Sequence, residues 1–356
     1  MRKKVEDFLP PWGLRSRHTQ SLLSSSPIRR RLVWRRSTAL RAVQQTVLLD
    51  GGDGVRLQGY LSRQSVAASR GLVVLLHGWE GSVNSNYILS NGARLYAAGF
   101  DVFRLNFRDH GDTHHLNPGM FHSNRLGEVV NSLADLQAKL QASSQLGDWT
   151  LAGYSLGGNF ALRVALQAGA AGLALRQVIS ICPVIDPARA LLAMESGHWF
   201  YQRYFERKWS RSLAIKRKCF PELYGHDDFT QLRSLRERTH YLATQYAGFK
   251  DSESYYDGYS IAGDRLAGMQ VPCTILTAED DPVVPVDDFR GLPEIPQLEI
   301  LVSAYGGHCG FLKNWKLESM AEDLIHNQVE KQTTKSAAIP QATSTNQART
   351  AAADPR

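Results

Sequence analysis

The sequence predicts an α/β fold in which a mostly parallel sheet is covered by helices on both faces. Short apolar runs of strand character, such as residues 71–76, alternate with longer segments of helical periodicity. Within residues 126–140, leucine and valine recur at helical spacing, as expected of an amphipathic helix. Alternating strands and helices are typical of parallel sheets, because each crossover between parallel strands needs a connection that covers the sheet.

The predicted elements follow one another in a consistent order. Residues 45–61, interrupted by a glycine-rich turn at 51–54, predict a hairpin that leads into the sheet. Residues 71–76 are a continuous aliphatic run, typical of a central parallel strand, and residues 88–98 predict the helix after it. Further strands are predicted at residues 101–107, 149–152, 177–182, 271–278 and 298–302.

The alternation stops between residues 185 and 266, where we predict a helical cap inserted into the core. Residues 199–259 contain 15 of the 33 aromatic residues of the chain. Tyr201, Phe205 and Trp209 follow one another at a spacing of four, which places them on one stripe of a helix. Such a stripe serves as the core of the cap or lines a pocket for an apolar substrate, and the sequence leaves both interpretations open.

A G-x-S-x-G motif joins the predicted strand at 149–152 to the helix that follows it. Ser155 is its centre, with Gly153 and Gly157 two residues away on either side. A sharp turn from strand to helix exposes the serine hydroxyl at the helix N-terminus, and small neighbours allow the strand and the helix to approach. This context predicts that Ser155 is a nucleophile.

A nucleophilic serine needs a base, and the base needs an acid that orients it. In α/β-hydrolases the chain order is serine, acid, histidine. His308 follows the predicted strand at 298–302 in a glycine-rich loop, which makes it the candidate base. Three acids at the end of the 271–278 strand compete for the third position: Glu279, Asp280 and Asp281. The D-x-V-V-P spacing that begins at Asp281 favours this residue.

The loop after the 71–76 strand reads H-G-W-E-G and predicts an oxyanion hole. Backbone N–H groups of Trp79 and of Leu156, the residue after the nucleophile, are the expected donors. His77 opens the loop, and we interpret it as a residue that fixes the loop by hydrogen bonding rather than as a base.

Together these motifs resemble the YheT-like α/β-hydrolases, the group that includes the abhydrolase-domain lipid esterases. The resemblance covers roughly residues 8–328. It includes an N-terminal signature at residues 8–20, the oxyanion loop with Ser85 and Tyr87, the acid loop and the histidine loop. In the loop after the 101–107 strand many members of the family have Arg-Gly, and this chain departs from that pattern at Asp109, which follows Arg108. The resemblance implies a serine hydrolase of carboxylic esters that uses neither metal nor organic cofactor.

Length and composition fit one large domain with an insertion. The chain has 356 residues, of which 43% are hydrophobic and 21% charged, as in a soluble globular protein. We expect a basic N-terminal arm at 1–45 that packs on the core, a first part of the hydrolase core at 46–184, the cap at 185–266, a second part of the core at 267–330, and a disordered tail at 331–356.

Positive charge is concentrated at the beginning of the chain. Residues 1–50 contain 11 Lys and Arg against 3 Asp and Glu, while the whole chain carries a net charge of +7. Arginines surround an apolar Leu-Val-Trp triplet in residues 29–36. This pattern fits peripheral contact with an anionic membrane, or a solvated strap on the core. Nucleic acid is not an expected partner, because no recognition module accompanies the patch.

No secretory signal or transmembrane run is recognisable, so a cytoplasmic location is expected. The cysteines Cys182, Cys219, Cys273 and Cys309 lack metal-binding or disulfide spacing, and we interpret them as free thiols. The cluster of Asp and His at residues 109–115, with His122 nearby, could hold a metal, although an exposed loop is the simpler interpretation. No metal is expected in the catalytic site.

The sequence therefore predicts a capped α/β-hydrolase that cleaves short- to medium-chain or lipid carboxylic esters through an acyl-enzyme. An acyltransferase on the same triad is an alternative. A catalytically silent hydrolase fold that binds lipid or a membrane surface is another.

Overall fold

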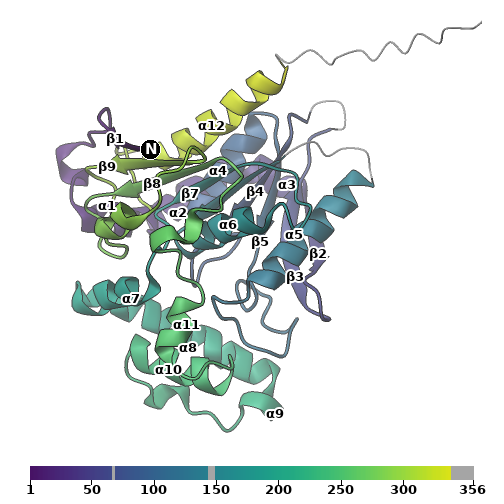
Figure 1. The fold of residues 1–356 in the computed structure, drawn as a ribbon, viewed down its shortest axis with the longest axis vertical. Helices are drawn as coiled ribbons and strands as arrows, with labels where there is room; N and C mark the ends of the chain where they lie inside the picture. The colour runs from purple at the N-terminus through teal and green to yellow at the C-terminus, as the bar shows by residue number, and fades with distance from the viewer. Residues whose placement is uncertain (66–68, 143–148, 338–356) are drawn as a thin grey trace, which may run out of the picture.

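The computed structural model describes residues 1–65, 69–142 and 149–337, and it contains a nine-stranded sheet (Figure 1). The strands are β1 (Arg2–Val5), β2 (Gln44–Asp50), β3 (Arg56–Ser62), β4 (Leu72–Leu76), β5 (Asp101–Leu105), β6 (Trp149–Tyr154), β7 (Leu175–Ile181), β8 (Cys273–Ala278) and β9 (Leu298–Ser303). Their order across the sheet is β1-β9-β8-β7-β6-β4-β5-β3-β2. Only β3 runs antiparallel to its neighbours β2 and β5. The prediction of a mostly parallel sheet is confirmed.

Helices cover both faces of this sheet. They are α1 (Arg17–Ser24), α2 (Pro27–Arg36), α3 (Thr38–Ala42), α4 (Asn86–Ala97), α5 (Leu126–Gln141), α6 (Leu156–Gln167), α7 (Pro187–Ser196), α8 (Trp199–Cys219), α9 (Pro221–Tyr224), α10 (Leu235–Gln245), α11 (Ser252–Asp257) and α12 (Met320–Ala337). The helices α5 and α6 contribute to the core on one face, and α4 and α12 contribute to the core on the other. Among the described helices, none has the length and apolar character needed to cross a membrane.

The central strand β4 shows why the sheet has two cores. Every residue of β4 is buried. Val74 and Leu76 belong to the core beneath α5 and α6, whereas Val73 and Leu75 belong to the core beneath α4 and α12. Successive side chains of a strand point to opposite faces. A strand buried on both faces therefore needs apolar residues at every position, which is the pattern that identified it in the sequence.

The N-terminal segment is more ordered than the predicted arm. β1 pairs in parallel with β9 at the edge of the sheet, with Arg2 opposite Ile300. The following α2 packs against α4. Arg29 of α2 is buried and forms an ion pair with the buried Glu322 of α12. One arginine of the basic cluster thus stabilises the packing of helices far apart in the sequence.

The helices α7 to α11 lie between β7 and β8 in the chain and gather at one end of the sheet (Figure 1). This group is joined to the loop after β5 by a buried ion pair of 2.7 Å between Lys216 Nζ of α8 and Asp109 Oδ1. Asp109 has a φ of +58°, a conformation that favours glycine. Its contact with Lys216 gives a physical reason for an aspartate at position 109, where the sequence departs from the family that it resembles.

At the other end of the chain, α12 continues to Ala337. The predicted tail at 331–356 is therefore helical at its beginning, which corrects the expected boundary after residue 330. The remaining part of that prediction, residues 338–356, lies outside the described residues.

Candidate active site

Ser155 lies at the turn between β6 and α6, with φ of +53° and ψ of −120°. A non-glycine residue with positive φ stores strain that the surrounding structure must support. An added Cβ on Gly153 would lie 2.2 Å from the carbonyl oxygen of Gly157, and one on Gly157 would lie 2.3 Å from the carbonyl oxygen of His77. Both glycines are therefore required by close backbone approach.

The structure brings the three sequence-predicted triad residues together. His308 Nε2 lies 2.9 Å from Ser155 Oγ, and His308 Nδ1 lies 2.9 Å from Asp281 Oδ2. The other carboxylate oxygen of Asp281 accepts backbone N–H groups from Val283 at 2.8 Å and Val284 at 3.0 Å. These bonds hold the carboxylate in line with the imidazole, which is the geometry that general-base activation of a serine requires.

The electrostatics of His308 fit this arrangement. Burial by itself lowers the pKa of the imidazole, but the charge of Asp281, the neighbouring Cys309 and the hydrogen bond to Asp281 together outweigh it and raise the pKa of His308 well above its ordinary value. This direction stabilises the imidazolium that forms when His308 accepts a proton from Ser155.

The loop after β4 runs directly beside the serine. An added Cβ on Gly78 would contact Ser155 Cβ at 3.2 Å. Tyr87 Oη accepts the N–H of Gly78 at 2.9 Å. Among the hydrogen bonds of the described residues, none uses the backbone N–H of Trp79 or of Leu156 as donor. Both expected oxyanion donors thus remain available for a ligand.

His77 fixes this loop by hydrogen bonding, as expected from the sequence. It is fully buried and donates from Nδ1 to the carbonyl oxygen of Gly78 at 2.8 Å, while Nε2 accepts the N–H of Phe107 at 3.2 Å. Burial lowers the pKa of His77 to about 4, so the ring is neutral and can make both bonds at neutral pH.

The N-terminal segment supports the histidine loop, a role that sequence reasoning missed. Ser21 Oγ of α1 accepts the backbone N–H of His308 at 2.9 Å. The buried Gln20 amide donates to the carbonyl oxygens of Leu14 and Leu312, and its own oxygen accepts the N–H of Leu312 at 2.6 Å. Gln20 was part of the N-terminal signature in the sequence, but no spacing rule connects it with residue 308.

Ser155 opens onto an apolar cavity beneath the α7–α11 helices. Phe205 and Trp209 of the predicted aromatic stripe line this cavity, whereas Tyr201 is buried and contacts His18. Phe205 stacks on the Trp79 ring with 5.1 Å between centroids. The remaining lining includes apolar side chains of α7 and tyrosines of α11, among them Ala190, Leu191, Met194, Tyr255 and Tyr256.

A second cavity meets the serine from the other side and is more polar. Arg30 and Lys208 contribute basic side chains to it, and Glu80 contributes a carboxyl group whose pKa burial raises to about 7. Ser155, Trp79 and Phe205 line both cavities, so the serine lies where an apolar space and a polar space meet.

Two histidines of the 109–122 segment, His110 and His114, form hydrogen bonds to different parts of the structure. His110 bonds the carbonyl oxygen of Arg108 through Nδ1 and the N–H of Glu80 through Nε2. His114 bonds Ser212 of α8. Within the described residues, the cluster suggested as a metal alternative does not converge on one point.

With this geometry in view, comparison with known proteins defines the class. The family described as the alpha/beta hydrolase fold matches residues 71–314, and the chain belongs to that family. It is 25% identical over 348 residues to "Putative esterase slr0264" of Synechocystis sp. (strain ATCC 27184 / PCC 6803 / Kazusa), covering 90% of this chain and 91% of that protein. It is also 25% identical over 312 residues to "Putative esterase YheT" of Escherichia coli (strain K12), covering 86% and 87%. The resemblance to the YheT-like α/β-hydrolases is confirmed.

Solved structures support the fold. The Pyrococcus furiosus esterase Pf2001 superposes with a TM-score of 0.51 at 14% sequence identity, covering 82% of this chain and 91% of that one. At this identity the likeness concerns the fold alone.

Proposed function

We propose that this protein is a serine hydrolase of carboxylic esters that works through Ser155, His308 and Asp281. The observation that carries the proposal is the continuous hydrogen-bonded chain from Ser155 Oγ through both nitrogens of His308 to Asp281, with 2.9 Å at each step. The strained backbone of Ser155 at a helix N-terminus supports the same role.

In the proposed reaction, His308 removes the proton of Ser155 as the serine oxygen attacks the ester carbonyl. The N–H groups of Trp79 and Leu156 stabilise the oxyanion, a contribution of roughly 3–4 kcal/mol per donor in enzymes of this kind. His308 then returns the proton to the leaving alcohol, and an acyl-enzyme on Ser155 remains. Next His308 activates a water molecule that releases the acid and restores the serine.

The two cavities favour an ester with one apolar and one polar side. The apolar cavity fits a short- to medium-length acyl chain, since its walls are aliphatic and aromatic. The polar cavity, which contains Arg30 and Lys208, fits the alcohol portion and gives water a path to the acyl-enzyme. Lipid esters of this form are the proposed substrate class.

We further propose that the exposed face of α2 contacts anionic membrane surfaces. Arg31, Arg35 and Arg36 are exposed, and Trp34 between them is 42% exposed. Basic side chains beside an interfacial tryptophan favour such a surface. Arg29 does not take part, because it is buried against Glu322.

A fluorophosphonate probe tests the catalytic proposal. We expect labelling of the wild-type protein at Ser155, hydrolysis of p-nitrophenyl esters, and loss of both in Ser155→Ala with an unchanged circular dichroism spectrum. A folded wild-type protein that neither reacts with the probe nor hydrolyses esters would instead favour a silent lipid-binding fold. Labelling with acyl transfer to an added alcohol in place of hydrolysis would favour an acyltransferase.

A further inference from the structure

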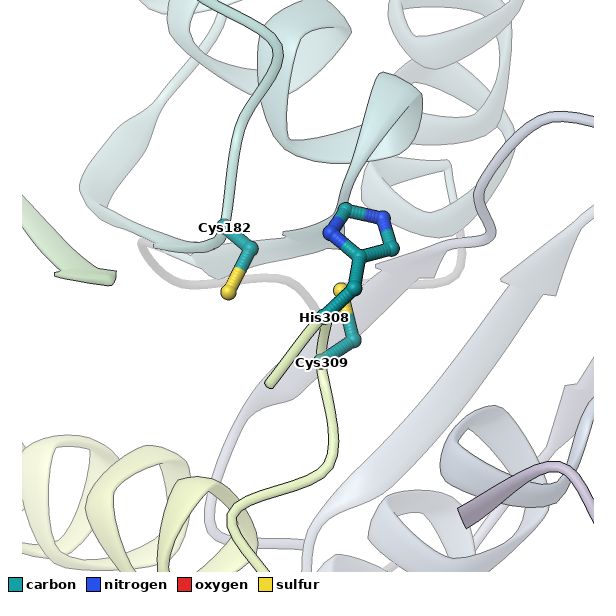
Figure 2. A group of neighbouring side chains, drawn as sticks. All are labelled: Cys182, His308 and Cys309. Carbon is teal, nitrogen blue, oxygen red and sulfur yellow. The ribbon is translucent and has the colours of Figure 1, made fainter. Parts of the chain in front are cut away.

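Two buried cysteines lie beside the candidate catalytic histidine. Cys182 directly follows β7, and Cys309 directly follows His308 (Figure 2). One ligand atom from each of Cys182, His308 and Cys309 lies within 4.8 Å of the others. Among the described residues, no other group of three or more His, Cys, Asp or Glu side chains is close enough to hold a metal ion.

The two thiols make long contacts to backbone carbonyl oxygens, and Cys309 also interacts with the Cys182 thiol and the His308 imidazole. Cys182 Sγ lies 3.9 Å from the carbonyl oxygen of Gly307, and Cys309 Sγ lies 3.8 Å from that of Ile181. Thiol hydrogen bonds are weak, so a metal ion that replaces these contacts removes little stabilisation. Both cysteines also have positive φ, 44° at Cys182 and 62° at Cys309, so the backbone holds both in an uncommon conformation.

The site has a route of entry. Cys309 and His308 both line the polar cavity that meets Ser155. A hydrated ion that enters this cavity reaches Cys309 and His308 first. Cys182 is fully buried and does not line this cavity, but it lies beside His308 and Cys309 and can complete the set of ligands (Figure 2).

We propose that Cys182, Cys309 and His308 form an inhibitory site for zinc, or a comparably thiophilic divalent cation, in the candidate active site. Thiolate sulfur and imidazole nitrogen are the ligands that zinc prefers, at about 2.3 Å and about 2.0 Å respectively. Tetrahedral geometry at these lengths places the donor atoms roughly 3.5–3.8 Å apart. In the structure the three donor atoms lie within 4.8 Å of one another, so metal binding requires them to move closer together. Binding releases the proton of each thiol to solvent, and a water molecule serves as the fourth ligand.

Binding at this site blocks the proposed reaction whichever nitrogen of His308 is used. A metal on Nδ1 replaces the hydrogen bond to Asp281, and a metal on Nε2 replaces the hydrogen bond to Ser155. In both cases His308 cannot accept the serine proton. This inference rests on the proposed function for its effect on catalysis, but the binding of the metal does not.

Zinc titration of the full chain tests the inhibition. The protein is treated with EDTA, kept reduced with a phosphine, and assayed with p-nitrophenyl butyrate at rising zinc concentrations. We expect one equivalent of zinc to abolish hydrolysis and EDTA to restore it. Mutation of a residue that only hydrogen-bonds a metal ligand lowers metal affinity about 10- to 100-fold. Loss of a sulfur ligand itself, in Cys182→Ser or Cys309→Ser, should therefore raise the inhibitory zinc concentration at least about tenfold.

Each variant is compared with its own zinc-free rate, and Cys273→Ser is the matched control. Cys273 is also a buried free cysteine, but it lies in β8 and outside the cluster. The control should keep wild-type sensitivity to zinc. Unchanged zinc sensitivity in both Cys182→Ser and Cys309→Ser would overturn the proposal, because inhibition would then come from another site.

A measurement on Ser155→Ala separates this inference from the proposed function. Cobalt bound by thiolates shows a sulfur-to-metal charge-transfer absorption that does not depend on turnover. We expect this absorption at one equivalent of cobalt in Ser155→Ala and its loss when Cys182→Ser is added. Absence of the absorption in Ser155→Ala overturns the metal site even if ester hydrolysis is established.

Discussion

Asp280 and Asp281 are adjacent, yet their carboxylates bind different parts of the histidine loop. Asp281 Oδ2 bonds the imidazole of His308 at 2.9 Å, whereas Asp280 Oδ1 accepts the backbone N–H of Gly307 at 2.8 Å. Burial and the charge of Asp281 raise the pKa of Asp280 to about 6, although the Gly307 bond lowers it. One acid therefore orients the imidazole of His308, while the other fixes the loop that carries this imidazole.

The first prediction separates these two acids. Asp281→Asn should reduce kcat by about 10²–10⁴, because the charge that stabilises the imidazolium is lost. Asp280→Asn should lose far less, since an asparagine oxygen can still accept from Gly307. Steady-state kinetics on a p-nitrophenyl ester measures both, with circular dichroism as the check on folding. If Asp280→Asn were the more damaged variant, the assignment of the triad acid would be wrong by one residue.

The second prediction concerns the backbone at the serine. Gly157→Ala should abolish hydrolysis and lower the melting temperature, because its Cβ would lie 2.3 Å and 2.5 Å from the carbonyl oxygens of His77 and Leu76. Gly169→Ala, just after α6, is the matched control, since nothing lies within 4 Å of an added Cβ there. Thermal unfolding and fluorophosphonate labelling are the measurements. Wild-type labelling of Gly157→Ala would contradict the tight turn.

The third prediction tests which cavity holds the acyl chain. Ala190 of α7 is buried and lines the apolar cavity, so Ala190→Phe should shift the preferred p-nitrophenyl ester toward shorter chains. The value of kcat/KM for the octanoate ester, divided by that for the acetate ester, should fall at least about tenfold. A tenfold change corresponds to a loss of about 1.4 kcal/mol of binding free energy. Leu192→Phe on the same helix, at a residue 53% exposed, should leave the ratio unchanged. A shift of equal size in the control would place the acyl chain elsewhere.

The fourth prediction links His77 to stability in acid. Its folded pKa of about 4 lies below the ordinary 6.5, so the unfolded chain binds the additional proton. The stability due to neutral His77 is therefore complete above pH 6.5 and is lost as the pH falls toward 4, on the order of 3 kcal/mol in all. Urea unfolding across this range should show a shallower pH dependence in His77→Asn than in the wild type. Parallel curves would mean that the pKa of His77 is the same in the folded and unfolded states.

The fifth prediction concerns the exposed face of α2. Replacing Arg31, Arg35 and Arg36 by Gln should weaken binding to vesicles of phosphatidylglycerol and flatten its dependence on salt. The control replaces three exposed arginines of α8 by Gln, with the same change in net charge: Arg203, Arg207 and Arg211. Equal weakening in the two variants would assign binding to net charge, and no weakening in the α2 variant would favour a solvated strap.

The three candidate triad residues could be predicted from the sequence because each lies in a recognisable local sequence pattern. Ser155 lies in a motif whose glycines are fixed by backbone contact, and His308 and Asp281 each follow a strand with an apolar pattern. Such patterns are easy to recognise where a short segment must adopt a particular backbone geometry without contacts from distant residues. The same reason explains why the two central strands β4 and β6 were found, since every residue in them is buried.

Features that depend on two distant segments could not be predicted. Nothing in residues 2–5 distinguishes an edge strand from a charged coil, and its pairing is visible only beside β9. The ion pairs of Arg29 with Glu322 and of Lys216 with Asp109 join elements whose approach is set by the whole fold. The same is true of Cys182, which meets Cys309 only because β7 and the histidine loop end at the same edge of the sheet.

The pairing of β1 with β9 also bears on the order in which the protein is made. Arg2 leaves the ribosome 298 residues before Ile300, which follows only after most of the sheet has been synthesised. At about 5–20 residues per second, β1 waits on the order of 15–60 s for its partner. During that interval Arg2, Lys3 and Lys4 keep it charged, and charged unpaired strands resist joining other chains. The basic residues of β1 therefore disfavour its pairing with other chains before β9 is made, and they do the same for its outer edge, which has no partner strand in the sheet of the described residues.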